Sequence, residues 1–124
     1  MASNRRFDFG PVALTATLTT NIWNVALTSV AGPVGFTATQ PFALLTKLMV
    51  LNKTAGAVTF SLWKGATGAN TAGTEFIGTA ISVPANSNVV YYLNSRFAST
   101  DFLVGGASAG TSLTIQGEFE LGFS

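Results

Sequence analysis

The sequence predicts an all-β fold, most simply an antiparallel β-sandwich of about eight strands in a jelly-roll-like arrangement, with a β-barrel as the alternative. Three observations support this prediction. No long window repeats apolar residues at helical spacing, apolar and polar residues alternate with a period of two, and glycine, proline and asparagine separate the segments. The 124 residues suit one domain. We expect it to span residues 11–124, after an arm over residues 1–10.

The predicted strands are short and are bounded by turn residues. In chain order they cover residues 12–19, 22–29, 42–52, 57–64, 75–83, 88–94, 101–107 and 113–121. The last segment is the clearest, because leucine, isoleucine and phenylalanine alternate there with threonine, glutamine and glutamate, as in a half-buried strand. Residues 42–52 are apolar on both faces over much of their length, which is typical of a central strand covered on both sides.

The connections between these segments have their own chemistry. Residues 52–56 resemble a hairpin loop with Gly56 in the left-handed conformation. Residues 105–110 predict a tight turn between the last two strands, since no lysine and no helix follow them as in a phosphate-binding loop. The longer loops at residues 30–40 and 65–74 are of the kind that carries function or moves.

The composition argues against catalysis. The chain has no histidine and no cysteine, which removes imidazole bases, thiolate nucleophiles, disulfides and the usual ligands of zinc and haem. We therefore expect no enzyme activity, no catalytic residue, no metal and no cofactor. Glu118 and Glu120 share one face of the last strand, and we interpret them as its solvent side or as polar contacts to a neighbouring subunit.

The scarcity of charge favours assembly over free diffusion. Only 9% of the residues are charged, against about 25% in ordinary domains, so packing against copies of itself requires little desolvation of charge. The net charge of +1 argues against a nucleic-acid partner. Thr46 and Lys47 interrupt the longest apolar stretch, so no membrane span is expected. No apolar segment follows the first arginines, so we expect no signal peptide and synthesis in a host cytoplasm.

Two groups of residues are candidates for binding. In the expected arm, Arg5, Arg6, Phe7 and Phe9 combine charge with aromatic surface and could anchor a partner, although a self-packed or disordered terminus is the alternative. The aromatic residues Trp23, Trp63 and Tyr92 could face a ligand such as a sugar. Tyr91 precedes Tyr92 on one strand, so the two side chains point to opposite faces.

A pattern over most of the chain resembles small virion accessory proteins of tailed bacteriophages, namely capsid decoration and head-fibre proteins. It consists of a threonine-rich opening at residues 16–23, a strand ending in asparagine at 48–54, the segments 58–62 and 81–87, and a closing strand with Glu118. The resemblance implies a structural virion protein that forms a homo-oligomer, with a trimer among the expected forms, and docks on the major capsid protein lattice. The alternative function is a carbohydrate- or receptor-binding module on a head or tail fibre.

Overall fold

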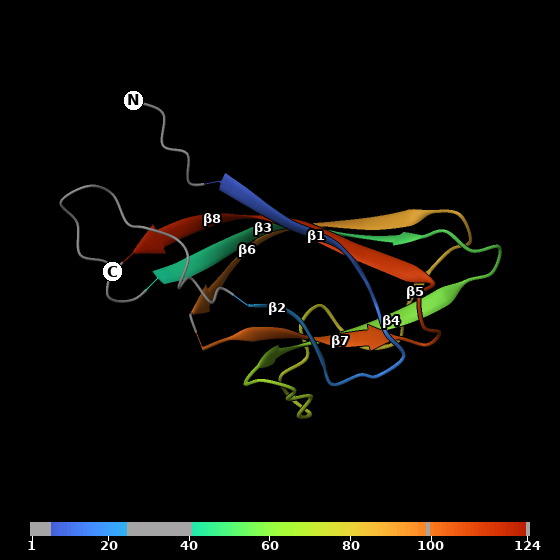
Figure 1. Cartoon of the computed structure of the whole chain (residues 1–124), viewed down its shortest axis with the longest axis horizontal. Coiled ribbons are helices and arrows are strands. Elements are labelled where there is room, and N and C mark those ends of the chain that lie inside the picture. Colours follow the sequence, from blue (N-terminus) through green and yellow to red (C-terminus); the bar gives the residue numbers. More distant parts are fainter. Residues whose placement is uncertain (1–5, 25–40, 99, 124) are drawn as a thin grey trace.

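Two four-stranded antiparallel sheets make up the part of the chain that the computed structural model describes, residues 6–24, 41–98 and 100–123 (Figure 1). The strands are β1 (Arg6–Ala13), β2 (Thr20–Asn24), β3 (Pro41–Asn52), β4 (Val58–Gly65), β5 (Ile81–Val83), β6 (Asn88–Ala98), β7 (Phe102–Ala107) and β8 (Leu113–Phe123). One sheet has the order β1-β8-β3-β6 and the other has the order β2-β7-β4-β5. This is the strand order of a jelly roll, and neither sheet closes into a barrel. The predicted fold class is therefore confirmed.

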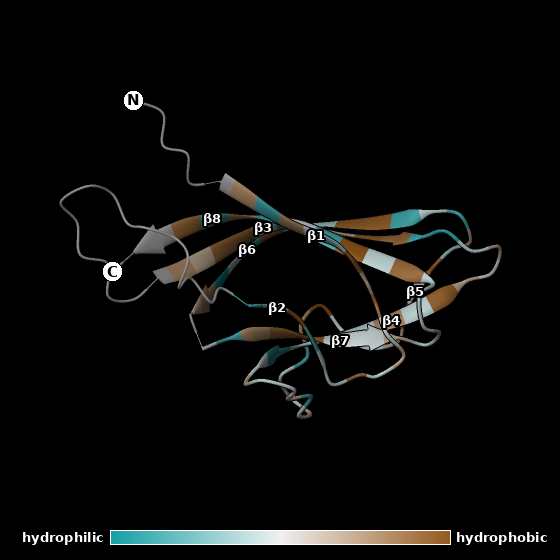
Figure 2. Ribbon diagram, viewed as in Figure 1, coloured by the Kyte–Doolittle hydropathy of each residue, from teal (hydrophilic) through white to brown (hydrophobic). Residues whose placement is uncertain are grey.

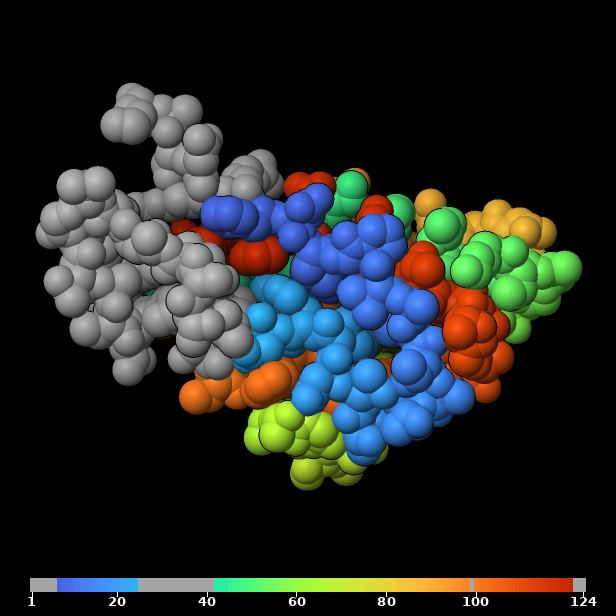
Figure 3. All heavy atoms as spheres, viewed as in Figure 1, coloured from blue at the N-terminus to red at the C-terminus, as the bar shows by residue number. Residues whose placement is uncertain are grey.

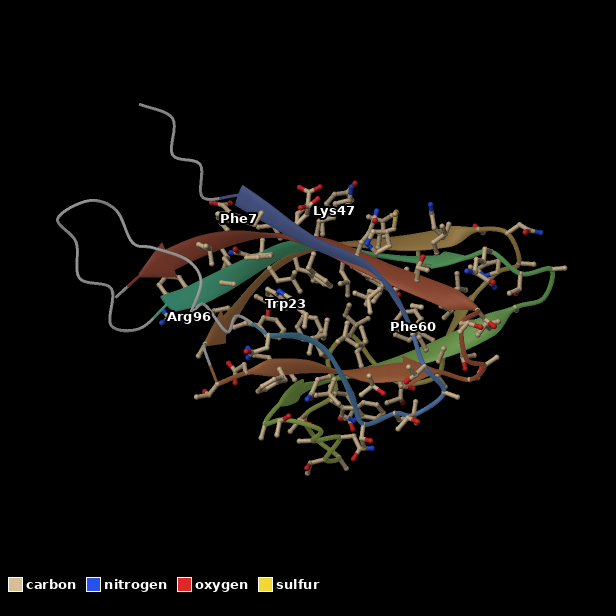
Figure 4. All side chains as sticks on the ribbon, viewed as in Figure 1. Phe7, Trp23, Lys47, Phe60 and Arg96 are labelled. Carbon is tan, nitrogen blue, oxygen red and sulfur yellow. The ribbon has the colours of Figure 1, made fainter. Side chains whose placement is uncertain are left out.

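The core lies between the two sheets, where apolar side chains of both are buried. Figure 2 shows hydrophobic residues recurring along the strands of both sheets. Its largest fully buried side chains include Phe60 of β4 and Phe97 of β6. Trp23 of β2 stands between the sheets, with its ring centroid 5.0 Å from that of Phe97 and 4.9 Å from that of Phe119 (Figure 4). Each such burial contributes about 1.5–3 kcal/mol, so these alternating residues hold the sandwich together.

The first strand begins earlier in the chain than predicted. Residues 12–19 were expected to form it, but β1 covers Arg6–Ala13 and pairs with β8. The chain then crosses to the other sheet, where β2 lies (Figure 1). In the space-filling view of Figure 3 this blue segment covers part of the near face. Of the predicted strand 22–29, β2 contains only the first part, and residues 25–40, including the expected loop 30–40, lie outside the described residues.

The segment 75–83 was predicted as one strand, and only Ile81–Val83 is regular. Before it, the backbone follows β4 through separate contacts, including a bridge between Glu75 and Trp63. The φ angles of Ile77 and Ala80 are 72° and 51°, values that interrupt a strand. The extended pairing therefore breaks into short pieces.

The loop after β3 is a crossing between sheets and not the predicted hairpin, because β3 and β4 belong to different sheets. The side chain of Asn52 organises this corner. It is fully buried, and its Nδ2 donates to the carbonyls of Gly56 at 2.9 Å and Val83 at 3.0 Å. Its Oδ1 accepts from the Thr54 amide at 2.9 Å. Gly56 has no positive φ, so the asparagine side chain replaces the turn glycine that we expected.

Gly105 and Gly106 belong to β7 and not to the predicted turn, which spans the residues after Ala107. The backbones of neighbouring segments approach both glycines closely. A Cβ atom on Gly105 would lie 2.1 Å from the Ser61 carbonyl oxygen, and one on Gly106 would lie 2.5 Å from that of Thr15. These positions need glycine because no side chain fits, which explains why a glycine pair stands inside a strand.

Candidate interaction surface

The outer face of the β1-β8-β3-β6 sheet carries a group of charged side chains. Asp8 of β1, Glu118 of β8 and Lys47 of β3 are neighbours in strand register. The Nζ atom of Lys47 lies 3.9 Å from the Glu118 carboxylate, and Figure 4 shows Lys47 on the side away from the other sheet. Glu120 is exposed two residues further along β8. We call Asp8, Lys47, Glu118 and Glu120 the charged strip.

The charged strip borders a small depression. Its volume is about 80 Å³, and its lining includes Asp8, Lys47, Gln116 and Glu118. Pockets for small molecules usually have about 300–1,000 Å³, so this depression does not suit a sugar or a cofactor. Among the described residues, no group of three or more acidic side chains could hold a metal ion.

Beside the charged strip lies an apolar one on β3 and β6. It consists of Met49, Leu51, Val90 and Tyr92, which are partly or fully exposed. Met49 lies opposite Val90 in the β3–β6 register, and Tyr92 is 80% exposed. We call these four residues the apolar strip. Its presence corrects the expectation for residues 42–52, because β3 is central in its sheet but Leu51 faces outward and is exposed.

The residues of the expected arm from Arg6 onward belong to the sheet. Phe7 is 40% exposed and stacks on Phe119, with ring centroids 5.9 Å apart. Phe9 stacks on Trp23 at 4.9 Å with an angle of 10° between the rings. Phe9 is therefore part of the core packing, and an arm over residues 1–10 is wrong for the described portion. Arg5 and the side chain of Arg6 lie outside what the structure describes.

The tryptophans are not available to a ligand. Trp23 is 8% exposed within the core, and Trp63 is 7% exposed on the outer side of β4. The chain after β4 returns along that strand, with the Lys64 amide donating to the Thr74 carbonyl at 3.0 Å and the Phe76 amide donating to the Leu62 carbonyl at 2.9 Å. Tyr92 is the exposed member of the predicted trio, so the three side chains do not form one platform.

The structure also shows which surface residues the sequence analysis missed. Leu51 and Val90 were not singled out, although both are exposed large hydrophobic residues. The alternation along β6 could have revealed Val90, because it shares a strand face with Tyr92. No helix among the described residues is long and apolar enough to cross a membrane.

Comparisons with known proteins add little at the level of residues. No protein-family model matches the chain, and no curated protein sequence is similar to it. Solved structures similar to the chain include two of the Tobacco streak virus coat protein, both with a TM-score of 0.41. One, of the coat protein dimer, is 13% identical and covers 98% of this chain and 87% of the other. The second is 11% identical and covers 100% and 89%.

Proposed function

We propose that this protein is a structural virion component that decorates a capsid and docks through the outer face of the β1-β8-β3-β6 sheet. The observation that carries the proposal is the apolar strip, an open patch on a sheet surface next to the charged strip. The low charge of the chain, its jelly-roll order, which viral capsid domains also use, and the resemblance to phage accessory proteins support it.

Docking would work by passive burial. Covering apolar surface contributes about 25 cal/mol per Å². Tyr92, which is 80% exposed, would contribute most, and Leu51 and Val90, which are 38% and 37% exposed, would contribute less. The charged strip would set the orientation and make the association depend on salt. Because a bound protein favours the lattice to which it binds, each docked copy would raise the free energy needed to open the capsid.

The test is co-sedimentation of the purified chain with capsids assembled from the major capsid protein of the virus in which the chain occurs. We expect Leu51→Glu to abolish docking, because it places a charge in a patch that docking would bury. Asn70→Glu is the matched control, since Asn70 is exposed in the loop after β4, far from the strip in the chain. If the unmodified chain fails to sediment with the capsids, or if Leu51→Glu docks as well as Asn70→Glu, the proposal is wrong.

The rival function, a carbohydrate- or receptor-binding module, rests on Tyr92. This side chain offers an exposed aromatic face, although both tryptophans are buried. A glycan titration of the unmodified chain and of Tyr92→Ala separates the two functions. Saturable binding that is lost in Tyr92→Ala would favour the rival, and Trp63→Ala would not be a valid probe because Trp63 is part of the packing.

A further inference from the structure

The strand β6 forms an open sheet edge. It pairs with β3 on one side, and no described strand pairs with its other side. The three other edge strands are short or interrupted. β1 contains Pro11 and a register shift, β2 has five residues and a register shift, and β5 has three residues. β6 has eleven residues and no proline, and its register shift against β3 lies between Tyr92 and Ser95, so residues 88–92 are regular. Its first half is therefore the edge most able to accept another strand.

The backbone groups at the open edge can be assigned from one hydrogen bond. The carbonyl of Ser87 accepts from the Asn52 amide at 2.8 Å, so Ser87 directs its backbone groups toward β3. Successive residues of a strand direct these groups to opposite sides. Tyr91 therefore also faces β3, whereas Val90 and Tyr92 direct their N–H and C=O groups to the open edge.

The side chains at this edge are apolar on both faces of the sheet. Burial alternates along β6 without interruption from Asn88 to Phe97. Val90 and Tyr92 are exposed on the outer face, and Val89, Tyr91 and Leu93 are only partly buried against the core on the inner face. Lysines and inward-pointing charges, which commonly protect sheet edges, are absent from residues 88–95.

We propose that β6 pairs with β6 of a second copy of the chain, antiparallel and about a two-fold axis, with Tyr91 opposite Tyr91. This register follows from the sequence of the strand. It places Val90 opposite Tyr92 of the second copy, an aromatic and β-branched pair of the kind that stabilises sheets. The same register brings Val89 toward Leu93 and Asn88 toward Asn94, and Leu93 and Asn94 are the two residues at which β6 shifts register against β3.

A two-fold axis requires each surface to be complementary to itself, and this register meets that requirement on both sheet faces. Shifting the pairing so that Tyr92 faces Tyr92 would place Val90 opposite Asn94 and would lose the apolar match. In the proposed register Arg96 lies opposite Asn86, so no like charges face each other. The two four-stranded sheets would join into one continuous sheet.

This interface deepens the proposed function by naming how the chain self-associates, and the two can fail separately. A dimer that binds no capsid would refute docking and leave the β6 interface standing. A monomer that docks on capsids would refute the β6 interface and leave the docking proposal standing. The dimer is one form of the expected homo-oligomer and differs from the trimer named among the expected forms.

The first test is sedimentation of the full chain at about 100 µM, where a dimer with a Kd of about 10 µM is mostly formed. We expect the mass of a dimer. Val90→Pro should give a monomer with unchanged circular dichroism, because the N–H that it removes faces the open edge and is not used by β3. Val90→Thr keeps that N–H and nearly the same shape, and this matched control should remain a dimer.

The second test fixes the register and does not depend on how well the proline variant folds. The chain has no cysteine, so a single introduced thiol can bridge only to another copy. Tyr91→Cys should form a disulfide between the two copies on mild oxidation. In the proposed register the two Tyr91 residues form a non-hydrogen-bonded antiparallel pair, whose Cα atoms lie about 4.5 Å apart, within disulfide reach. Tyr92→Cys is the control and should cross-link poorly, since it faces Val90.

These results decide the proposal. A dimer that Val90→Pro dissociates, together with preferential cross-linking of Tyr91→Cys, supports it. A monomer or a trimer in the unmodified chain, a dimer that persists in folded Val90→Pro, or preferential cross-linking of Tyr92→Cys overturns it.

Discussion

The buried side chain of Asn52 offers the sharpest test of what holds the two sheets together. Its side-chain amide makes three hydrogen bonds with the backbone. The Nδ2 group donates to the carbonyls of Gly56 and Val83, and Oδ1 accepts from the backbone N–H of Thr54. Its Oδ1 also lies 2.7 Å from the Thr54 hydroxyl. These contacts join the end of β3 in one sheet to the corner before β4 and to β5 in the other. Replacing the side chain should therefore loosen one end of the sandwich.

Asn52→Ala removes all of these bonds and leaves buried backbone groups without their partner. At about 1 kcal/mol for each net hydrogen bond, we expect a loss of about 3 kcal/mol in the free energy of unfolding. An entropy of unfolding of about 2.1 cal/mol/K per residue converts this loss to a Tm decrease of about 10 °C. Asn70→Ala, at an exposed loop position, is the control and should stay within about 0.5 kcal/mol of the unmodified protein.

Asn52→Asp adds a test that depends on pH. The introduced carboxylate would be buried and would face two carbonyl oxygens, so its pKa in the folded state should be raised above the unfolded value of about 3.9. A raised pKa means that the folded state binds the proton more tightly, so stability falls as the pH rises above the unfolded pKa. The destabilisation should therefore be larger at neutral pH than near pH 4.

Urea unfolding followed by tryptophan fluorescence measures these effects, because Trp23 and Trp63 are both buried. Each variant is compared with the unmodified protein at the same pH, so that other titrating groups cancel. An Asn52→Ala loss below about 0.5 kcal/mol would refute the role assigned to this side chain. If Asn52→Asp lowers the free energy of unfolding equally at all pH values, the introduced carboxylate is not buried against the carbonyls of Gly56 and Val83.

Three further predictions concern packing and charge. Trp63→Ala should lower the free energy of unfolding, measured in urea, by about 3–5 kcal/mol. Trp63→Phe should lower it far less, because the buried indole N–H has no hydrogen-bond partner to lose. Equal losses in the two variants would contradict this prediction. Gly117→Ala should lower the free energy of unfolding by about 1–3 kcal/mol, since its Cβ would lie 2.5 Å from the Phe9 ring and 2.8 Å from the Lys47 carbonyl oxygen. A Tm equal to that of the unmodified protein would argue against this close approach. Glu118→Gln should change stability by less than about 1 kcal/mol because its ion pair with Lys47 is exposed, and a larger loss in calorimetry would mean that the charged strip is structural.

The fold class could be predicted because its evidence is local. Period-two alternation in residues 113–121 and turn residues between short apolar runs follow directly from strand geometry. The first strand was missed although Arg6, Phe7, Asp8 and Phe9 also alternate. Two arginines and two phenylalanines before the first clear strand pattern made this segment resemble a terminal arm, and its partner β8 is distant in sequence.

The candidate surface was harder to predict because burial depends on distant segments. Trp63 lies on the outer face of its sheet and is buried there, whereas Leu51, within a segment that reads as fully covered, is exposed. The local sequence around each residue is compatible with either outcome. The corner at Asn52 was misread for the same reason, since a hairpin and a crossing between sheets use similar turn residues.

The position of β8 between β1 and β3 has a consequence for how the protein is made. The last strand in chain order occupies the interior of its sheet, so β1 and β3 have no common neighbour until β8 has been synthesised. During translation that sheet must remain incomplete, with the apolar faces of β1 and β3 unprotected. Pairing between strands this distant in sequence also slows folding. We therefore expect the nascent chain to complete this sheet only after β8 has emerged from the ribosome, and to be most prone to aggregate before that point.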